Sequence, residues 1–282
     1  MTYTEHDVAG RITAMLDSGQ SEGYFTPEQT GLLDQYHAGG VGAVDKLIPS
    51  LAISPGDVVI DVGSGFGGPA RRIAEQTSAT VVGVDITAGY VEAAQTLTMR
   101  MGYGDQVRFQ HADITALSAD HMLELGVERP FDAAITMHVQ MNVADKHRWF
   151  SAIARLLAPR ARLAVWEVCA TAGQQPPWPM PWSLDGTDSF LSTPHELEQA
   201  IRSAGFATLA WVDETAWVND WSAATLGDGA PRPELILPMI IDDGMTRVMN
   251  FSTALRDGTL PVMRGAFIKA EPSTTATPTQ PA

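Results

Sequence analysis

An apolar run, a cluster of glycines and an amphipathic segment follow one another between Val58 and Ala74. The run VVIDV is typical of a buried strand, and four glycines then occur within residues 63–68. A strand, a glycine-rich loop and a helix open the nucleotide-binding site of a doubly wound α/β sheet. The glycines let the backbone approach a ligand, and the first turn of the helix offers free N–H groups. These residues therefore predict a site for a nucleotide-like cofactor.

The spacing Gly63-x-Gly65-x-x-Gly68 also fits the dinucleotide fingerprint, so the glycines alone do not choose the ligand. Asp61, two residues before the first glycine, is more selective. A carboxylate about 4 Å from a pyrophosphate would cost a few kcal/mol at an effective dielectric constant of about 20. S-adenosylmethionine (SAM) carries an ammonium and a sulfonium instead of phosphates. Asp61 therefore favours SAM.

Two further acids follow predicted strands in the pattern that such a cofactor needs. Asp85 ends the strand 80–85 and lies 22 residues after Gly63. This offset is close to the roughly 20 residues that separate a glycine loop from an acid that binds ribose hydroxyls. Asp113 follows a third predicted strand, 107–110.

The segments DVGSGFGGPA, VVGVDIT and HADI resemble motifs I, II and III of class I SAM-dependent methyltransferases. Residues 136–168 resemble the small-molecule branch of that family, near the ubiquinone/menaquinone and sarcosine/dimethylglycine methyltransferases. The resemblance covers roughly residues 35–270, and it implies SAM as the cofactor. One departure is APRAR at 158–162, where the family usually has a Pro-Gly-Gly turn.

The resemblance also assigns cofactor roles to individual residues. The glycine loop would hold the methionine part of SAM, the acid after the second strand the ribose, and the acid after the third strand the adenine. The residues assigned to the cofactor are Asp61, Gly63, Ser64, Gly65, Asp85, Ile86, Asp113, Ile114, Met137 and Tyr24. For Tyr24, packing in the core is an equally good interpretation.

Predicted strands and helices alternate along the chain, an order that forms a parallel sheet with helices on both faces. The predicted strands are 58–62, 80–85, 107–110, 131–137, 162–169, 206–212 and 262–270. The expected fold class is α/β, a Rossmann-like, seven-stranded, mostly parallel sheet with a helical and loop cap. The resemblance implies that the last two strands form an antiparallel edge.

The chain divides into five predicted parts. Residues 1–50 are expected to form a helical lid and 51–170 the SAM-binding α/β core. Residues 171–257 would supply an acceptor cap together with further helix and strand, and 258–270 the final strand. Residues 271–282 are expected to be disordered because they lack apolar side chains.

Methyl transfer from a sulfonium is an in-line displacement, and a general base is needed only if the acceptor must lose a proton. Glu167 and His138 are the candidates, because both lie near the carboxyl ends of predicted strands. The alternative for Glu167 is a carboxylate satisfied by backbone or by an arginine, and for His138 a hydrogen bond to a loop. His37, before Gly39-Gly40, is a third candidate in a lid over SAM; its alternative is a histidine at a helix C-terminus.

Four aromatic residues, Trp166, Trp178, Trp182 and Phe190, suggest a partly apolar acceptor. The residues expected to contact it are Tyr36, Gln140, Trp166, Trp178, Trp182 and Phe190. Taken one at a time, the tryptophans fit the core of the cap as well. Gln140 would orient a carbonyl or a hydroxyl of the acceptor.

Composition excludes several classes of partner. The chain has 18 basic and 33 acidic residues, a net charge of −15, so a nucleic-acid partner is not expected. Its apolar runs are too short for a membrane span, and we expect a cytoplasmic protein. The single cysteine, Cys169, excludes an internal disulfide, and no spacing of His, Cys and Asp predicts a metal site. The sequence leaves open whether the protein forms a homo-oligomer.

The leading hypothesis is transfer of a methyl group from SAM to a small-molecule acceptor, a specialised metabolite or its precursor, at O, N or C. One alternative is C-methylation of an isoprenoid diphosphate, which would need Mg²⁺ or basic groups that the sequence does not clearly show. A second is a SAM-fold protein that binds the cofactor without transferring methyl, as a cyclase or a partner subunit. A third is an NAD(P)-dependent oxidoreductase, against which Asp61 and Asp113 argue.

Overall fold

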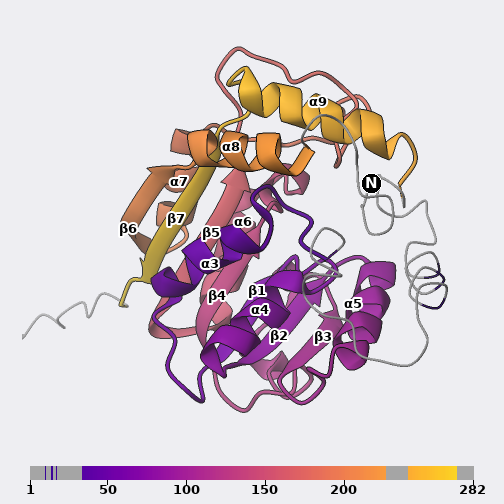
Figure 1. Cartoon of the computed structure of the whole chain (residues 1–282). Coiled ribbons are helices and arrows are strands. Elements are labelled where there is room, and N and C mark those ends of the chain that lie inside the picture. Colours follow the sequence, from indigo (N-terminus) through magenta and orange to yellow (C-terminus); the bar gives the residue numbers. More distant parts are fainter. Residues whose placement is uncertain (1–9, 11–13, 15–16, 18–33, 227–240, 272–282) are drawn as a thin grey trace, which may run out of the picture.

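A central sheet of seven strands carries the molecule, in the order β3-β2-β1-β4-β5-β7-β6 (Figure 1). A computed structural model describes residues 10, 14, 17, 34–226 and 241–271. The strands are β1 (Val58–Val62), β2 (Thr80–Asp85), β3 (Val107–His111), β4 (Phe131–Met137), β5 (Leu157–Val168), β6 (Phe206–Asp213) and β7 (Val262–Lys269). Strands β1 to β5 pair in parallel, whereas β7 pairs antiparallel with both β5 and β6. The predicted fold class is confirmed.

Helices cover both faces of this sheet. The α-helices are α3 (Gly40–Leu51), α4 (Gly68–Thr77), α5 (Ala88–Arg100), α6 (Lys146–Leu156), α7 (Pro194–Ser203), α8 (Thr215–Leu226) and α9 (Gly244–Arg256). One apolar layer includes Leu47 of α3, Ile73 of α4 and Val91 of α5. The opposite layer includes Phe150 of α6 and Ile201 of α7. Among the described helices, none has the length and apolar character that crossing a membrane requires.

Local signals in the sequence explain where several of these elements begin. Pro69 occupies the first turn of α4, where its missing N–H costs no hydrogen bond. The helix α7 begins with a capping box, in which Thr193 and Glu196 each bond the other's backbone N–H. The side chain of Asp145 caps α6 by accepting from Arg148 N at 2.9 Å.

Two features of the fold differ from the predictions. The segment 158–162 lies inside β5, with Arg160 at a φ of 62°, whereas a turn was expected before the strand. The helix α8 was not predicted, because its apolar residues are not spaced so that they would lie on one face of a helix. It lies with α9 across the end of the sheet, where the two helices cap the carboxyl ends of the strands (Figure 1).

The predicted parts of the chain can now be placed on these elements. Of residues 1–50, α3 packs against the sheet as part of its core, and most of the region before residue 34 lies outside the described residues. Region 171–257 contains α7 and β6, which extend the sheet layer, as well as α8 and α9 of the cap. Residues 272–282 lie outside the described residues.

Candidate active site

A cleft of about 650 Å³ opens at the carboxyl ends of the parallel strands. One half of the cleft is formed by the loops after β1, β2, β3 and β4. The other half is formed by Trp182 and by the facing sides of α8 and α9. We call these the cofactor half and the acceptor half.

The glycine loop of the cofactor half is held tightly against its neighbours. Gly63 donates its N–H to Val84 O at 2.8 Å and has a φ of 76°, a left-handed conformation that glycine adopts without strain. A Cβ at Gly63 would lie 2.3 Å from Val139 Cγ2, so a side chain cannot be accommodated without movement. Gly65, with a φ of 51°, would meet nothing within 4 Å, and it donates its N–H to Asp85 Oδ2 at 2.9 Å.

Asp61 is a buried carboxylate in the wall of the cleft. Its side chain is 2 % exposed, and its Oδ2 has no hydrogen-bond partner among the described residues. Burial, and then the neighbouring charge of Asp85, raise the pKa of Asp61 to about 7. A buried carboxylate in the wall of a cleft, with one oxygen that no described residue binds, fits a cationic ligand group such as the ammonium of SAM.

The other residues assigned to the cofactor also line the cleft, with the exception of Tyr24, which lies outside the described residues. Asp85 accepts hydrogen bonds from the N–H groups of Gly65 and Thr87, and burial raises its pKa. Each carboxylate oxygen keeps a lone pair for a further donor. Asp113 accepts from Thr115 N at 2.8 Å, and the nearby Ile86 is 54 % exposed. The cleft thus brings the three acids together as predicted.

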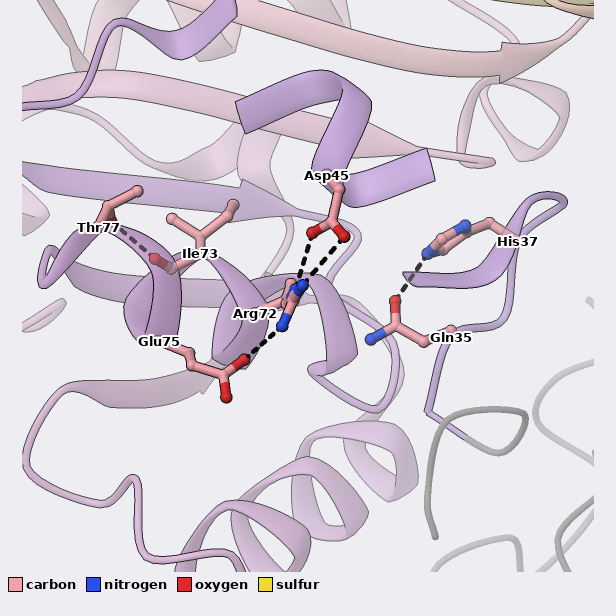
Figure 2. Close-up of polar contacts among 7 residues, drawn as sticks. All are labelled: Gln35, His37, Asp45, Arg72, Ile73, Glu75 and Thr77. Atoms are coloured by element: carbon pink, nitrogen blue, oxygen red, sulfur yellow. Dashed lines mark hydrogen bonds and ion pairs between the residues drawn. The ribbon is translucent and has the colours of Figure 1, made fainter. Parts of the chain in front are cut away.

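Residues 34–38 form another wall of the cleft, and the segment 34–39, which precedes α3, is not helical. The alternative of a histidine at a helix C-terminus is therefore wrong for His37. In this segment Asp34 pairs with the buried guanidinium of Arg71 at 2.9 Å. Figure 2 shows the contact between His37 Nε2 and Gln35 Oε1, which are 3.0 Å apart. Figure 2 also shows how Arg72 of α4 holds α3 in place through Asp45.

Both histidines of the site are neutral and adjoin one another. Burial lowers the pKa of His37 to about 4 and moves the pKa of His138 well below its usual value. The two ring centroids are 6.2 Å apart, and the His138 ring also meets Phe251 edge-on at 5.9 Å. His138 has a φ of 55°, and its Nε2 has no hydrogen-bond partner among the described residues.

Glu167 does not line the cleft, so the structure does not support its assignment as a base that touches the acceptor. Its side chain is fully buried and turns toward the loop after β4, where it accepts from Val139 N at 3.0 Å and Gln140 N at 3.2 Å. Burial raises the pKa of Glu167 to about 8. This arrangement matches the alternative of a carboxylate satisfied by backbone, and it fixes the turn that follows His138.

Four of the six residues predicted to contact the acceptor do not line the cleft. Gln140 is buried and donates to Val168 O, and Trp166 is buried against Trp217, with ring centroids 5.7 Å apart. Trp178 packs over Gly186, and Phe190 is 42 % exposed at the surface. These side chains stabilise the walls of the cleft from behind or lie away from it.

Tyr36 and Trp182 do line the cleft, as predicted. The Tyr36 hydroxyl donates to Pro181 O at 3.3 Å. The Trp182 indole donates to Ser189 Oγ at 3.0 Å and packs edge-on against Phe251, with centroids 5.8 Å apart. Trp182 therefore connects the loop after β5 with α9 of the cap.

The sequence-based predictions missed most of the acceptor half. The additional lining residues there come from α8 and α9 and are Trp221, Ser222, Ala224, Thr225, Val248, Phe251, Ser252 and Leu255. Gln35 was also missed. The spacing of Val248, Phe251, Ser252 and Leu255 is that of one helical face, a signal from which α9 could have been recognised as a wall.

The fold and this cleft together define the class of the protein as a class I SAM-dependent methyltransferase. A family model described as a methyltransferase domain matches residues 53–204, more than half of the chain. The chain belongs to this family, whose relatives act on small molecules, and the predicted resemblance is confirmed.

Individual relatives are consistent with this assignment. The methyltransferase GfsG of Streptomyces halstedii is 28 % identical over 249 residues, 84 % of this chain and 81 % of that protein. The O-methyltransferase resE of Aspergillus sclerotiorum is 27 % identical over 168 residues, which is 58 % of this chain and 60 % of that protein. The geranyl diphosphate C-methyltransferase of Streptomyces coelicolor has a similar fold, with a TM-score of 0.63, 16 % identity, and 93 % of this chain and 98 % of that chain covered.

Proposed function

We propose that this methyltransferase transfers the methyl group of SAM to a hydroxyl oxygen of a partly apolar small-molecule acceptor, with His138 as the general base. The observation that carries this proposal is the imidazole of His138 in the wall of the cleft, whose pKa burial lowers and whose buried Nε2 no described residue binds. The relative named an O-methyltransferase agrees with it.

The cofactor half would bind SAM through its three acids. Asp61 would hold the ammonium group, and Asp85 would accept hydrogen bonds from the ribose hydroxyls. Asp113 would bind the adenine amino group, with Ile86 and Ile114 packing on the ring. SAM supplies an electrophilic methyl group on a sulfonium.

The acceptor half would hold an apolar body beside that methyl group. Trp182, Trp221 and Phe251 line it with aromatic surface, and Val248 and Leu255 add aliphatic surface. Among the lining residues that the structure describes there is no lysine or arginine. These walls suit a lipophilic molecule, and they give no support to the alternative of a diphosphate acceptor.

His138 would accept the proton of the acceptor hydroxyl as the oxygen forms its bond to the methyl carbon. The methyl–sulfur bond breaks with its electron pair remaining on sulfur, and the products are a methyl ether, S-adenosylhomocysteine and a protonated His138. Holding the oxygen and the methyl carbon in line would supply much of the rate enhancement, and the base typically adds about 10²–10⁴-fold. His37 would act as a positioning residue for His138, because its ring packs edge-on against that of His138 and is itself held by a hydrogen bond to Gln35 Oε1 or Ala38 O.

A panel of phenols, aliphatic alcohols and amines, with S-adenosylhomocysteine formation as the readout, tests the reaction. We expect turnover with apolar hydroxyl compounds, and His138→Asn should lower kcat at least about 100-fold while SAM affinity changes less than twofold. The matched control is His147→Asn, on the exposed side of α6.

Three outcomes would contradict the proposal: methylation of amines only, wild-type kcat in His138→Asn, or binding of SAM without turnover of any acceptor. The last would favour the alternative of a SAM-fold protein that does not transfer methyl.

A further inference from the structure

The two cap helices each place one serine in the wall of the acceptor half, and the two hydroxyls meet. Ser222 Oγ of α8 and Ser252 Oγ of α9 are 3.1 Å apart. Both residues line the cleft, and Ser222 is only 5 % exposed. Figure 1 shows the two helices lying together across the end of the sheet.

The hydrogen bond between these serines leaves one hydroxyl proton without an acceptor. A hydroxyl offers one donor and two acceptor positions, so a serine pair uses one of its two protons internally. A helical hydroxyl often donates to the carbonyl one turn earlier, as Thr77 does to Ile73 O at 2.7 Å. Neither serine makes such a bond, and the described structure gives the pair no other partner.

The residues around the pair make the free hydroxyl proton select for ligands that carry an oxygen at this place. The pair's neighbours on the same two helices that line the cleft include the apolar side chains of Trp221, Phe251 and Leu255, together with Thr225. An unmet hydrogen-bond donor in an apolar wall is costly, so a bound molecule that supplies an oxygen there is favoured over one that does not. Because no lysine or arginine lines the described cleft, a neutral oxygen fits better than an anionic group.

The pair belongs to the cap helices α8 and α9, whereas the proposed base, His138, follows β4. Phe251 precedes Ser252 in α9, and its ring lies between two contacts, His138 at 5.9 Å and Trp182 at 5.8 Å. Ser252 thus follows in α9 the residue whose ring packs on the proposed base, and both serines line the acceptor half. A ligand that reaches both places needs two oxygen functions on one apolar skeleton.

We infer that Ser222 and Ser252 form a specificity site for a second, neutral oxygen of the acceptor, such as a carbonyl or ether, remote from the methylated hydroxyl. The inference rests on the proposed function, because it names a further feature of the same acceptor. It defines the substrate class as an oxygenated lipophilic compound with at least two oxygen functions.

Benzophenone and diphenylmethane test the site, because they have nearly the same shape and differ in one carbonyl. Their affinities for the full-length protein saturated with S-adenosylhomocysteine can be measured by ligand-detected NMR. The variants are Ser222→Ala, Ser252→Ala and the double variant. The matched control is Ser203→Ala, an exposed serine of α7. Thermal unfolding and S-adenosylhomocysteine titration check that each variant is folded.

We expect the wild-type protein and Ser203→Ala to bind benzophenone about tenfold more tightly than diphenylmethane, a difference of ~1.4 kcal/mol. The double variant should bind both compounds equally, with unchanged affinity for S-adenosylhomocysteine, and each single variant should lose part of the preference. No preference in the wild type, or a preference that survives in the double variant, would overturn the inference. Methyl transfer that proceeds normally alongside either result would leave the proposed function standing, so the two failures are distinguishable.

Discussion

Asp61 should make cofactor affinity depend on pH, and Asp61→Asn should remove that dependence. In the free protein the side chain is buried beside Asp85, and its pKa is about 7. A bound ammonium group stabilises the ionised carboxylate, so binding releases the proton that Asp61 holds at low pH. The affinity must therefore rise with pH until Asp61 is ionised in the free protein as well.

The size of the effect follows from the pKa of Asp61. At pH 5, about 1 % of the free protein has an ionised Asp61, and ionising the rest costs ~2.7 kcal/mol. At pH 7 about half is ionised, so the affinity should increase about 50-fold from pH 5 to pH 7. His37 stays largely neutral across this range, because burial lowers its pKa to about 4, and burial also moves the pKa of His138 well below its usual value.

Isothermal titration calorimetry with S-adenosylhomocysteine at pH 5, 6 and 7 measures this slope. This ligand keeps the ammonium group of SAM and cannot react. Asp85 also has a raised pKa and contributes with the same sign, so the comparison between wild type and Asp61→Asn isolates Asp61. A wild-type affinity that is flat from pH 5 to pH 7, or an equally steep slope in Asp61→Asn, would refute the reasoning.

Three further perturbations address the walls of the cleft. Glu167→Ala leaves the buried N–H groups of Val139 and Gln140 without their acceptor, so urea unfolding should show a loss of about 2–4 kcal/mol; an unchanged midpoint would contradict a bracing role. Gly63→Ala places a Cβ 2.3 Å from Val139 Cγ2 at a left-handed φ, and calorimetry should show S-adenosylhomocysteine affinity at least about tenfold weaker. Wild-type affinity in this variant would mean that the loop relaxes freely. Trp182→Ala should raise the KM of an apolar acceptor about tenfold or more in steady-state kinetics without changing SAM affinity. If only the SAM affinity changed, the assignment of Trp182 to the acceptor half would be wrong.

The parallel core was predictable because its signals are local. The strands 58–62, 80–85 and 131–137 are short, mostly apolar runs, the first followed by a glycine and the second ending at an acid, and their predicted bounds agree with the structure. Asp61 and Asp85 could be assigned to the cofactor half because parallel strands bring their carboxyl ends to one edge.

The acceptor half was much less predictable, because tertiary contacts decide it. Nothing in the sequence around Glu167 says that its carboxylate turns toward the loop at Val139, 28 residues away. The side-chain amide of Gln140 likewise donates its hydrogen bond to a backbone carbonyl of β5 instead of facing the cleft. The helix α8 is apolar on several sides because it lies between the sheet end and α9, so it lacks the one-sided pattern that identifies surface helices.

The insertion of β7 between β5 and β6 imposes an order of assembly on the chain during synthesis. Among the described strands, β6 pairs only with β7, and 48 residues, 214–261, separate the two. Until β7 has been made, β5 and β6 both present bare edges, and a nascent chain halted before Val262 would carry two surfaces prone to aggregation. Since α8 and α9 lie within those 48 residues, β7 closes the loop that carries them over the cleft. The half of the cleft that holds the acids comes from β1 to β4 and is translated first, so the ribosome delivers the cofactor half well before the acceptor half can close.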